Sequence, residues 1–455
     1  MDSNEAACEK SMIDTITAIA TPPGRGGVGI VRISGSQAFS IAQTICHFSN
    51  TKTPDVARAV FYDAQRSIID DGLVLFFKNP RSFTGEDVAE LQAHGSPMVL
   101  DQLIARAIDL GARLARPGEF TERAFLNHKI DLTQAEAIAD LISASSIQAA
   151  RAATRSLQGE FSKKIEVLQE MLTTLRMHVE AAIDFPEEEI DFLADPKIET
   201  SLKEIIYQVE QIKNTVKQGV LLQSGINVVI AGKPNVGKSS LLNYLSGKSS
   251  AIVTDIPGTT RDILRESIQI DGLPLHIIDT AGLRETKDIV EQEGVRRTKA
   301  QLSQADVVLW MRDINDDVFT LDQLGLNAEI KPPVILITNK IDLTNKSPAV
   351  IAHPDFTEVC ISVTKSLGLD LLKKKIHQFA GFHSEEQDIF IARRRHVDTI
   401  LRAHQQLIQA QQHLRQGELL AEGLRQAQLV LSEITGELTS DDLLGKIFSE
   451  FCIGK

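Results

Sequence analysis

The amino-acid sequence predicts a multidomain protein that combines α/β and all-α parts. Short apolar runs bounded by glycine and proline indicate strands in residues 1–128 and again in residues 222–382. Heptad-like apolar stripes indicate helices in residues 129–221 and 383–455, on either side of the second α/β region. We therefore predict an N-terminal α/β domain and a discontinuous helical domain into which a second α/β domain is inserted.

The first domain is predicted from strand patterns and one strong helix start. Strands are expected at residues 15–20, 73–77 and 88–92, and a helix from Ser96, where a capping residue precedes proline at the first turn. Residues 24–29 match the G-x-G-x-x-G pattern of dinucleotide-binding folds, but a strand pattern follows where such a fold needs a helix. We therefore expect a glycine-rich loop between strands.

The helical segments are predicted from apolar residues spaced alternately by three and four positions. These residues are Ile165, Leu168, Leu172, Leu175 and Val179 in the first segment, and Leu420, Leu424, Ala427, Leu431 and Ile434 in the second. Apolar residues at this spacing lie on one face of a helix and are predicted to pack in the core. A further helix is expected over residues 198–220, and a last one after the capping residue Ser440. We expect the helices before and after the inserted domain to pack together.

Residues 232–239 match G-x-x-x-x-G-K-[ST], the phosphate-binding loop. The apolar residues 226–231 before it predict a buried strand, and residues 240–245 after it predict a helix. In that context successive backbone N–H groups and a helix N-terminus converge on phosphate oxygens. Lys238 is expected to reach the β- and γ-phosphates, and the Ser239 hydroxyl to bind Mg²⁺.

Three further motifs follow in the order expected of a GTP-binding domain. Residues 279–282, Asp-Thr-Ala-Gly, follow an apolar run, so the aspartate is predicted at a strand end near the metal. Residues 339–342, Asn-Lys-Ile-Asp, follow another, and the Asp342 carboxylate can accept hydrogen bonds from guanine N1 and its 2-amino group. Adenine lacks both donors and would leave that carboxylate unpaired. Residues 362–364, Ser-Val-Thr, are expected to close the base pocket.

The composition limits the possible partners. The chain of 455 residues has 48 basic and 61 acidic side chains, so any RNA contact must be local. Basic clusters at residues 373–375 and 393–396 are as typical of a solvated helix face as of an RNA-binding patch. The four cysteines, Cys8, Cys46, Cys360 and Cys452, predict neither a metal site nor a disulfide framework, which fits a reducing cytosol. No secretory signal or run of about 20 apolar residues occurs, so we expect a cytoplasmic protein without a membrane span.

Several stretches together resemble the MnmE (TrmE) family of tRNA modification GTPases over the full length of the chain. They are residues 21–30, 83–87, 116–120, 254–262, the four nucleotide motifs and the terminal Phe-Cys-Ile-Gly-Lys at 451–455. Related GTPases share the central motifs but not the N-terminal domain or this C-terminus. The departures are small: Pro257 lies in the loop before Gly258, and Val363 stands where the family commonly has alanine.

The resemblance implies an activity that the motifs alone do not. Such proteins act with a flavin-dependent (FAD) partner, MnmG, as a heterotetramer on wobble uridines of certain tRNAs. The complex adds an aminomethyl-type group, aminomethyl or carboxymethylaminomethyl, at carbon 5. The one-carbon unit comes from a tetrahydrofolate derivative, 5-formyl or 5,10-methylene, held by the N-terminal domain, which also forms a constitutive homodimer.

The resemblance also implies functional residues. The folate contacts correspond to Arg32, Glu90, Lys129 and Lys455, where arginine and lysine suit the carboxylates of the folate glutamate tail and a carboxylate suits pterin N–H groups. Structural ion pairing is an equally good interpretation of Arg32 and Glu90 without the resemblance. Cys452 lies in the C-x-G-K motif, where a catalytic role and a packed cysteine both stay open.

The expected GTP site combines the four motifs with the segment after the phosphate-binding loop. Its residues are Asn235, Val236, Gly237, Lys238, Ser239, Ser240, Thr254, Asp255, Ile256, Pro257, Gly258, Thr259, Thr260, Asp279, Thr280, Ala281, Gly282, Asn339, Lys340, Asp342, Ser362, Val363 and Thr364. In this set Thr260 is expected to join Ser239 on Mg²⁺.

The hydrolysis mechanism must differ from that of Ras-type enzymes. The position of their water-orienting glutamine is Leu283 in this chain, and no arginine finger is identifiable. Oxygen atoms of Asn235, and of Thr254, Ile256 and Thr259, suit a hard monovalent cation, and the resemblance implies K⁺. Water orientation is assigned to Glu291, for which an ordinary exposed helix glutamate is the alternative.

Two other functions account less well for the sequence. A GTPase that assists ribosome assembly as an RNA-binding switch usually carries an additional C-terminal RNA-binding module, and no G-x-x-G-containing candidate occurs. A P-loop kinase is disfavoured because residues 339–342 select guanine.

Overall fold

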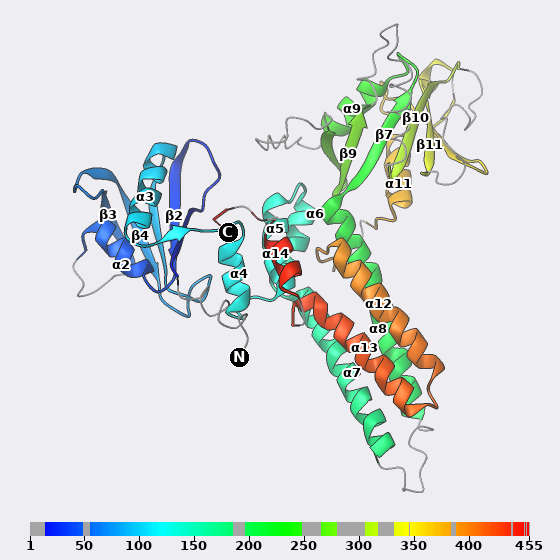
Figure 1. The fold of residues 1–455 in the computed structure, drawn as a ribbon. Helices are drawn as coiled ribbons and strands as arrows, with labels where there is room; N and C mark the ends of the chain where they lie inside the picture. Colours follow the sequence, from blue (N-terminus) through cyan, green and yellow to red (C-terminus); the bar gives the residue numbers. More distant parts are fainter. Residues whose placement is uncertain are drawn as a thin grey trace, which may run out of the picture. The chain divides into compact units, whose positions relative to one another are not determined.

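The computed structural model describes residues 14–48, 55–184, 196–247, 265–279, 305–316, 332–344, 346–383, 388–437, 440–449, 451 and 453–454. The chain divides into two compact units, one formed by Met1–Ala139 with Ser432–Lys455 and the other by Asp140–Leu431 (Figure 1). Each unit contains its own sheet. The combination of α/β and all-α parts predicted from the sequence is confirmed.

A six-stranded sheet in the order β3-β4-β5-β2-β1-β6 forms the centre of the first unit. Its strands are β1 (Ile16–Ile19), β2 (Gly26–Ser34), β3 (Val56–Tyr62), β4 (Ile68–Phe77), β5 (Val88–Gly95) and β6 (Arg113–Leu114). Helices α2 (Ala38–Cys46) and α3 (Pro97–Asp109) pack on this sheet. Val31, Ile33, Ile41, Leu91 and Leu103 belong to the core that they enclose. Because side chains alternate along a strand, Arg32 lies on the opposite face of β2 from Val31 and Ile33.

The strand β2 begins earlier than predicted. Gly26 pairs with Gly95 of β5, and Gly29 pairs with Ala93, with a register shift between them. A Cβ atom on Gly29 would lie 2.6 Å from a methyl carbon of Leu100. Glycine permits this close approach of strand and helix. The prediction of a loop over residues 24–29 is therefore wrong for Gly26 onwards, where the glycines belong to the sheet.

The C-terminal segment packs within the first unit. Helix α14 (Asp441–Ser449) contacts α4 (Glu119–Leu126), and Phe448 and Phe451 share an apolar cluster with Leu132 at the start of α5 (Leu132–Ser143). Gly454 has a φ of 95°, and a Cβ atom there would lie 2.1 Å from the Ile19 carbonyl oxygen. The end of the described chain is therefore fixed against β1.

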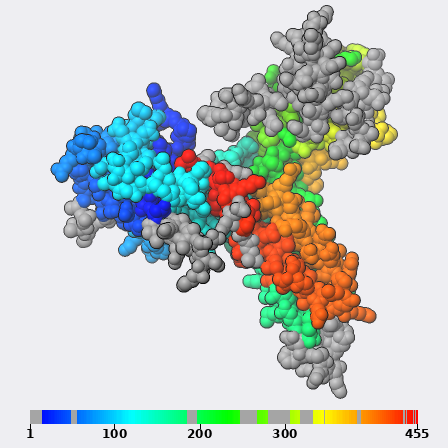
Figure 2. Space-filling view, in the orientation of Figure 1, coloured from blue at the N-terminus to red at the C-terminus, as the bar shows by residue number. Residues whose placement is uncertain are grey.

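Long helices make up the all-α part of the second unit. They are α6 (Ile147–Leu157), α7 (Glu160–Asp184), α8 (Pro196–Ser224), α12 (Arg394–Gln412) and α13 (Gly417–Thr435). All ten residues of the two predicted apolar stripes are at most 2 % exposed, so their assignment as core is confirmed. Helices α12 and α13 lie side by side along the face shown in Figure 2, and α12 packs along α8. The expected packing between helices before and after the insertion is thus confirmed.

A seven-stranded sheet in the order β12-β13-β11-β10-β7-β9-β8 forms the α/β part of the second unit. The strands are β7 (Ile226–Gly232), β8 (Arg265–Ile270), β9 (Leu273–Asp279), β10 (Val307–Asp313), β11 (Val334–Asn339), β12 (Ala349–Ala352) and β13 (Thr357–Cys360). The five central strands are parallel, and β8 and β12 are antiparallel edges. In such sheets ligands bind at the carboxyl ends of the parallel strands.

The chain enters and leaves this α/β part beside the same turn of α8. The Gln218 side-chain amide donates to the Gly381 carbonyl oxygen at 2.6 Å, and its oxygen accepts from the His383 backbone N–H at 3.0 Å. One residue later, a Cβ atom on Gly219 would lie 2.2 Å from the Phe390 carbonyl oxygen. The returning chain, after α11 (Leu369–Ala380), is thus held directly against α8.

Two adjacent leucines of α13 test the assigned core. Leu420→Ala is expected to lower the free energy of unfolding by about 2–5 kcal/mol, because the buried side chain leaves a cavity. The matched control Leu419→Ala, at a side chain that is 52 % exposed, should change it by less than about 0.5 kcal/mol. Urea unfolding followed by circular dichroism measures both; equal losses would contradict the predicted core face.

Candidate functional site

The phosphate-binding loop connects β7 to α9 (Lys238–Gly247). Gly232 has a φ of 143°, and a Cβ atom on it would lie 2.1 Å from the Met311 carbonyl oxygen of β10. Asn235 has a φ of 64°, a left-handed conformation that asparagine tolerates better than most residues. The Lys238 ammonium donates to the carbonyl oxygens of Gly232 at 2.7 Å and Lys233 at 2.8 Å. The sequence therefore folds into the closed strand–loop–helix arrangement that was predicted.

Asn339, the first residue of the guanine motif, joins this loop to the base-pocket segment. Its side-chain amide donates to the Val236 carbonyl oxygen at 2.8 Å, and its oxygen accepts from the Val363 backbone N–H at 3.1 Å. A Cβ atom on Gly237 would lie 2.4 Å from the Asn339 amide nitrogen. Glycine at 237 is thus required for the asparagine to approach the loop, and the asparagine has a positioning role.

Two aspartates at the carboxyl end of β10 were not predicted from the sequence: Asp313 is the last residue of the strand, and Asp316 lies three residues beyond it. Asp313 pairs with Lys340 at 2.7 Å, and Asp316 pairs with Lys233 at 3.1 Å. The hydrogen bond from Lys340 lowers the pKa of Asp313, and the backbone N–H of Asp313 lowers that of Asp316. Both carboxylates hold lysines of nucleotide motifs. Their position at the carboxyl end of a buried strand, where the other motifs also lie, was the available signal.

The remaining described residues of the expected GTP site lie in the same part of the fold. Asp342 is in the short 3-10 helix η4 (Ile341–Leu343), with an exposed side chain. Ser362 and Val363 are buried after β13, whereas Thr364 is exposed. Ser239 and Ser240, in the first turn of α9, are exposed. Asp279 ends β9 as predicted.

Several expected site residues lie outside the described residues. They are Thr254, Asp255, Ile256, Pro257, Gly258, Thr259, Thr260, Thr280, Ala281, Gly282, Glu291, Cys452 and Lys455.

The structure brings Arg32 and Glu90 together on neighbouring strands. They pair across β2 and β5, and the Arg32 Nε donates to the Glu90 carboxylate at 2.8 Å. Arg32 Nη1 also donates to the Gly454 carbonyl oxygen at 3.4 Å, which puts the C-terminal motif beside it. The guanidinium carbon lies 5.6 Å from the ring centroids of both Phe83 and Phe120. The Arg32 guanidinium, the Glu90 carboxylate and two aromatic rings therefore lie close together.

Lys129 reaches the same region through the β4–β5 loop, residues 78–87. Its ammonium donates to the Pro80 carbonyl oxygen at 2.9 Å, and a Cβ atom on Gly85 would lie 3.2 Å from the Lys129 Cγ. Phe83 and Phe120 were not predicted as site residues, although they lie in two of the stretches that carry the family resemblance, residues 83–87 and 116–120. Phe120 lies in the first turn of α4, which begins at Glu119 after Gly118 with a φ of 68°.

Two family models cover nearly all of the chain. The model of the GTP-binding protein TrmE N-terminus matches residues 15–129, and the model of the MnmE helical domain matches residues 132–452. The chain belongs to the MnmE family of tRNA modification GTPases. The resemblance inferred from the motifs is confirmed, and as a member of this family the protein is a GTP-hydrolysing enzyme.

Curated MnmE-family relatives resemble the chain over its full length. The tRNA modification GTPase MnmE of Coxiella burnetii (strain Dugway 5J108-111) is 56 % identical over 449 residues, 97 % of this chain and 99 % of the relative. That of Legionella pneumophila (strain Corby) is 56 % identical over 452 residues, 97 % of this chain and all of the relative. The solved G domain of the Thermotoga maritima FeoB iron transporter is 27 % identical, covers 34 % of this chain and 98 % of its own, and has a TM-score of 0.26.

Two residues of the basic cluster at 393–396, Arg393 and His396, have structural contacts in this MnmE-family chain, whereas Arg394 is exposed. Arg393 precedes α12 and pairs with Asp140 at 3.1 Å, while buried His396 contacts the Phe161 ring at a centroid distance of 5.1 Å. Cys46 and Cys360 are buried free thiols, and burial raises the pKa of Cys46 to about 12. Neither thiol is therefore suited to nucleophilic chemistry. Among the described residues, no helix is long and apolar enough to cross a membrane.

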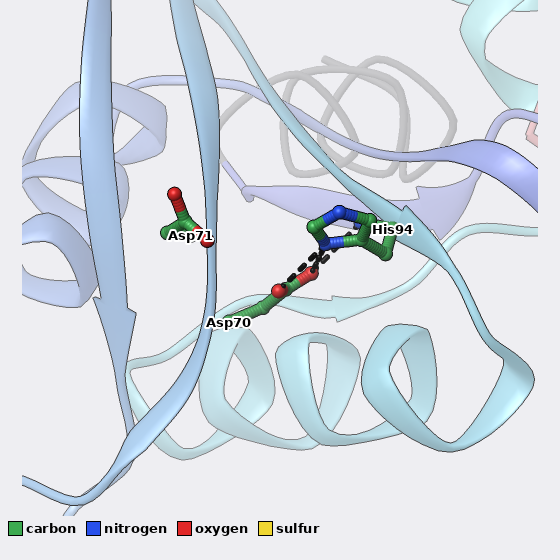
Figure 3. A group of neighbouring side chains, drawn as sticks. All are labelled: Asp70, Asp71 and His94. Atoms are coloured by element: carbon green, nitrogen blue, oxygen red, sulfur yellow. Dashed lines mark hydrogen bonds and ion pairs between the residues drawn. The ribbon is translucent and has the colours of Figure 1, made fainter.

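One cluster on the first sheet has the composition of a metal site. Asp70, Asp71 and His94 place one ligand atom each within 4.8 Å of one another. Figure 3 shows the His94 ring directed at Asp70, with Nδ1 2.9 Å from a carboxylate oxygen. That hydrogen bond raises the pKa of His94, and Asp71 is paired with Arg58 at 2.8 Å. The side chains that could bind a metal are thus engaged with one another or with Arg58. We therefore assign the cluster a structural role, in which the contact between Asp70 and His94 joins β4 to β5.

Asn339→Ala tests the bridge between the two nucleotide motifs. The change leaves the Val236 carbonyl and the Val363 N–H without their partner, at a cost of about 1–3 kcal/mol for each buried group. We expect weaker GTP binding in titration calorimetry and a lower melting temperature. Asn315→Ala is the control, because that exposed side-chain amide bonds to Asp313 and, among the described residues, to neither nucleotide motif. Equal GTP affinity in both variants would contradict the bridge.

Proposed function

We propose that this protein is the GTP-hydrolysing component of a complex that modifies carbon 5 of tRNA wobble uridines. An FAD-dependent partner of the MnmG kind would complete the complex, and the added group would be aminomethyl or carboxymethylaminomethyl. Support comes from full-length relatives that are named tRNA modification GTPase MnmE. The observation that carries the proposal further is the Arg32–Glu90 pair, which lies beside two aromatic rings and the C-terminal motif.

The residues around Arg32 fit a tetrahydrofolate derivative, 5-formyl or 5,10-methylene. A guanidinium suits the carboxylates of the glutamate tail, a carboxylate suits the N–H groups of the pterin, and the exposed ring of Phe83 suits its flat surface. Arg32, Glu90 and Lys129 would bind the group, with Lys455 contributing from the chain end next to Gly454. When bound, it supplies the one-carbon unit. We propose a catalytic role for Cys452 from its position in the C-x-G-K motif.

The nucleotide site fits GTP with Mg²⁺. The Lys238 ammonium, which bonds to two carbonyl oxygens of the loop, would bind the phosphates. The Asp342 carboxylate would accept hydrogen bonds from guanine. Ser239 and Thr260 would bind Mg²⁺. We assign the orientation of water to Glu291. A K⁺ ion would be held by Asn235 with Thr254, Ile256 and Thr259, and would supply positive charge near the β- and γ-phosphates.

The proposed organisation follows the functional parts of the chain. Residues 1–128 would bind folate and form the homodimer, and residues 222–382 would bind GTP. Residues 129–221 and 383–455 would form the helical domain that carries the C-x-G-K motif. Contacts group the described residues from Ser432 onwards with the N-terminal residues, which supports a role of the chain end at the Arg32 site.

The cation proposal predicts a salt-specific rate. GTP hydrolysis should be several-fold faster in K⁺ than in Na⁺, and Asn235→Ala should abolish this difference because it removes one oxygen ligand. Asn243→Ala, at an exposed position of α9, is the matched control. Phosphate release is measured at equal ionic strength. Equal rates of the unaltered protein in the two salts would refute the cation model.

A complementation experiment tests the overall function. Cells that lack this protein should lose the aminomethyl-type modification of wobble uridine, detected by mass spectrometry of tRNA nucleosides. The unaltered gene should restore it. Arg32→Ala should not, although the purified variant should still hydrolyse GTP, because Arg32 lies in the first unit and the GTP site in the second. Unchanged wobble uridines in the deletion strain would overturn the proposal.

A further inference from the structure

The β4–β5 loop is anchored to the face of β2 that carries Arg32. Ser34 lies two residues after Arg32 and therefore on the same face of the strand. Its hydroxyl donates to the Glu86 carboxylate at 2.7 Å and forms a hydrogen bond of 2.7 Å with the Thr84 hydroxyl. The Ser82 hydroxyl donates to the Glu86 backbone carbonyl at 2.5 Å, so the loop is also closed on itself. Glu86 is thus the point at which the loop is attached.

Arg123 binds the same carboxylate from α4. Its Nη1 donates to the two Glu86 oxygens at 3.1 and 3.2 Å, and its Nη2 donates to Glu119 at 3.1 Å and Asp14 at 2.5 Å. Arg123 is only 4 % exposed. A buried guanidinium is tolerated when its N–H groups are paired, and its planar fork can bind two carboxylates at once, which a lysine ammonium does less well.

These contacts set the spacing of two aromatic rings. Phe83 is carried by the loop that Arg123 binds through Glu86, and Phe120 directly follows Glu119 on α4. Phe120 is fully buried, whereas Phe83 is 37 % exposed. Both ring centroids are 5.6 Å from the Arg32 guanidinium carbon. The guanidinium of Arg123 therefore joins the two segments that together surround Arg32.

We propose that Arg123 is a positioning residue for the ligand site at Arg32. It holds the β4–β5 loop against α4, so that Phe83 and Phe120 keep Arg32 and Glu90 in the arrangement that binds folate. This inference rests on the proposed folate function. Because Arg123 is buried and its guanidinium bonds to Glu86 and Glu119, it acts through these carboxylates and does not contact the ligand.

The same cluster offers a matched control. Arg113 also pairs with Glu119, at 2.5 Å, and with Asp14. Together with burial, which opposes ionisation, the hydrogen bonds from Arg113, the Arg116 N–H and Arg123 leave the pKa of Glu119 at about 2. The contacts of Arg113 are to Asp14, Leu114 and Glu119, none of which belongs to the loop. Arg113→Lys therefore perturbs the cluster without releasing Phe83.

The experiment compares full-length Arg123→Lys, Glu86→Gln and Arg113→Lys proteins, with Arg32→Ala as the site control. The dissociation constant of 5-formyltetrahydrofolate is measured by equilibrium dialysis, that of GTP by calorimetry, and stability by urea unfolding. Arg123→Lys should weaken folate binding about tenfold or more, as expected for loss of a charged hydrogen bond. Arg113→Lys should weaken it less than about threefold. GTP binding should stay unchanged in all variants.

A double-mutant cycle separates positioning from general destabilisation. The effects of Arg123→Lys and Glu86→Gln on folate binding should not add, because both break the same link. Additive effects, or folate losses in Arg113→Lys and Arg123→Lys that simply follow their loss of stability, would overturn the proposal. If Arg123→Lys does not fold, Glu86→Gln alone must still weaken folate binding more than Arg113→Lys does.

Hydrogen exchange distinguishes this inference from the proposed function. Peptides covering residues 78–87 should exchange faster in Arg123→Lys than in Arg113→Lys, because the loop has lost its anchor. If neither the unaltered protein nor Arg32→Ala binds folate, the proposed folate function is refuted, whatever the exchange rate of the loop. Equal exchange of the loop in Arg123→Lys and Arg113→Lys would refute the role of Arg123, whatever the protein binds.

Discussion

The second unit depends on how the chain that leaves the inserted α/β part is returned to α8. The buried amide of Gln218 binds one carbonyl and one N–H of the returning segment, and Gly219 leaves space for the backbone at Phe390. Since α12 begins only a few residues later and packs along α8, this local closure fixes where the two helices meet. The helical residues before and after the insertion can then form one core.

The same closure places the sheet next to the helices. The turn between β8 and β9 is close to α6, because a Cβ atom on Gly272 would lie 2.4 Å from the Gln148 side chain. His276 of β9 bonds to the Ser224 carbonyl oxygen at 2.9 Å, at the end of α8. The strand β9 leads to Asp279 of the nucleotide motif. The nucleotide edge and the helical part are therefore linked by direct contacts along one hairpin.

Around Glu119 in the first unit, paired charges and not apolar packing hold α4 and the β4–β5 loop together. Arg113 and Arg123 surround Glu119, and their guanidinium groups overcome the effect of burial and lower the pKa of this carboxyl to about 2. Each of these charges would be costly to bury alone, so the cluster is stable only when it is complete. This mutual dependence gives a polar loop a fixed position beside Arg32.

The sequence by itself determined the fold class, the nucleotide motifs and the core stripes, because these depend on local periodicity and on short motifs whose residues are contiguous. It also singled out Arg32 and Glu90 through family resemblance. Only the tertiary structure decided that Gly26 is strand, that Arg393 serves Asp140, and that Phe83 and Phe120 meet at Arg32. Those features depend on partners that are distant in the chain, and spacing along a sequence carries no record of which distant residues will meet.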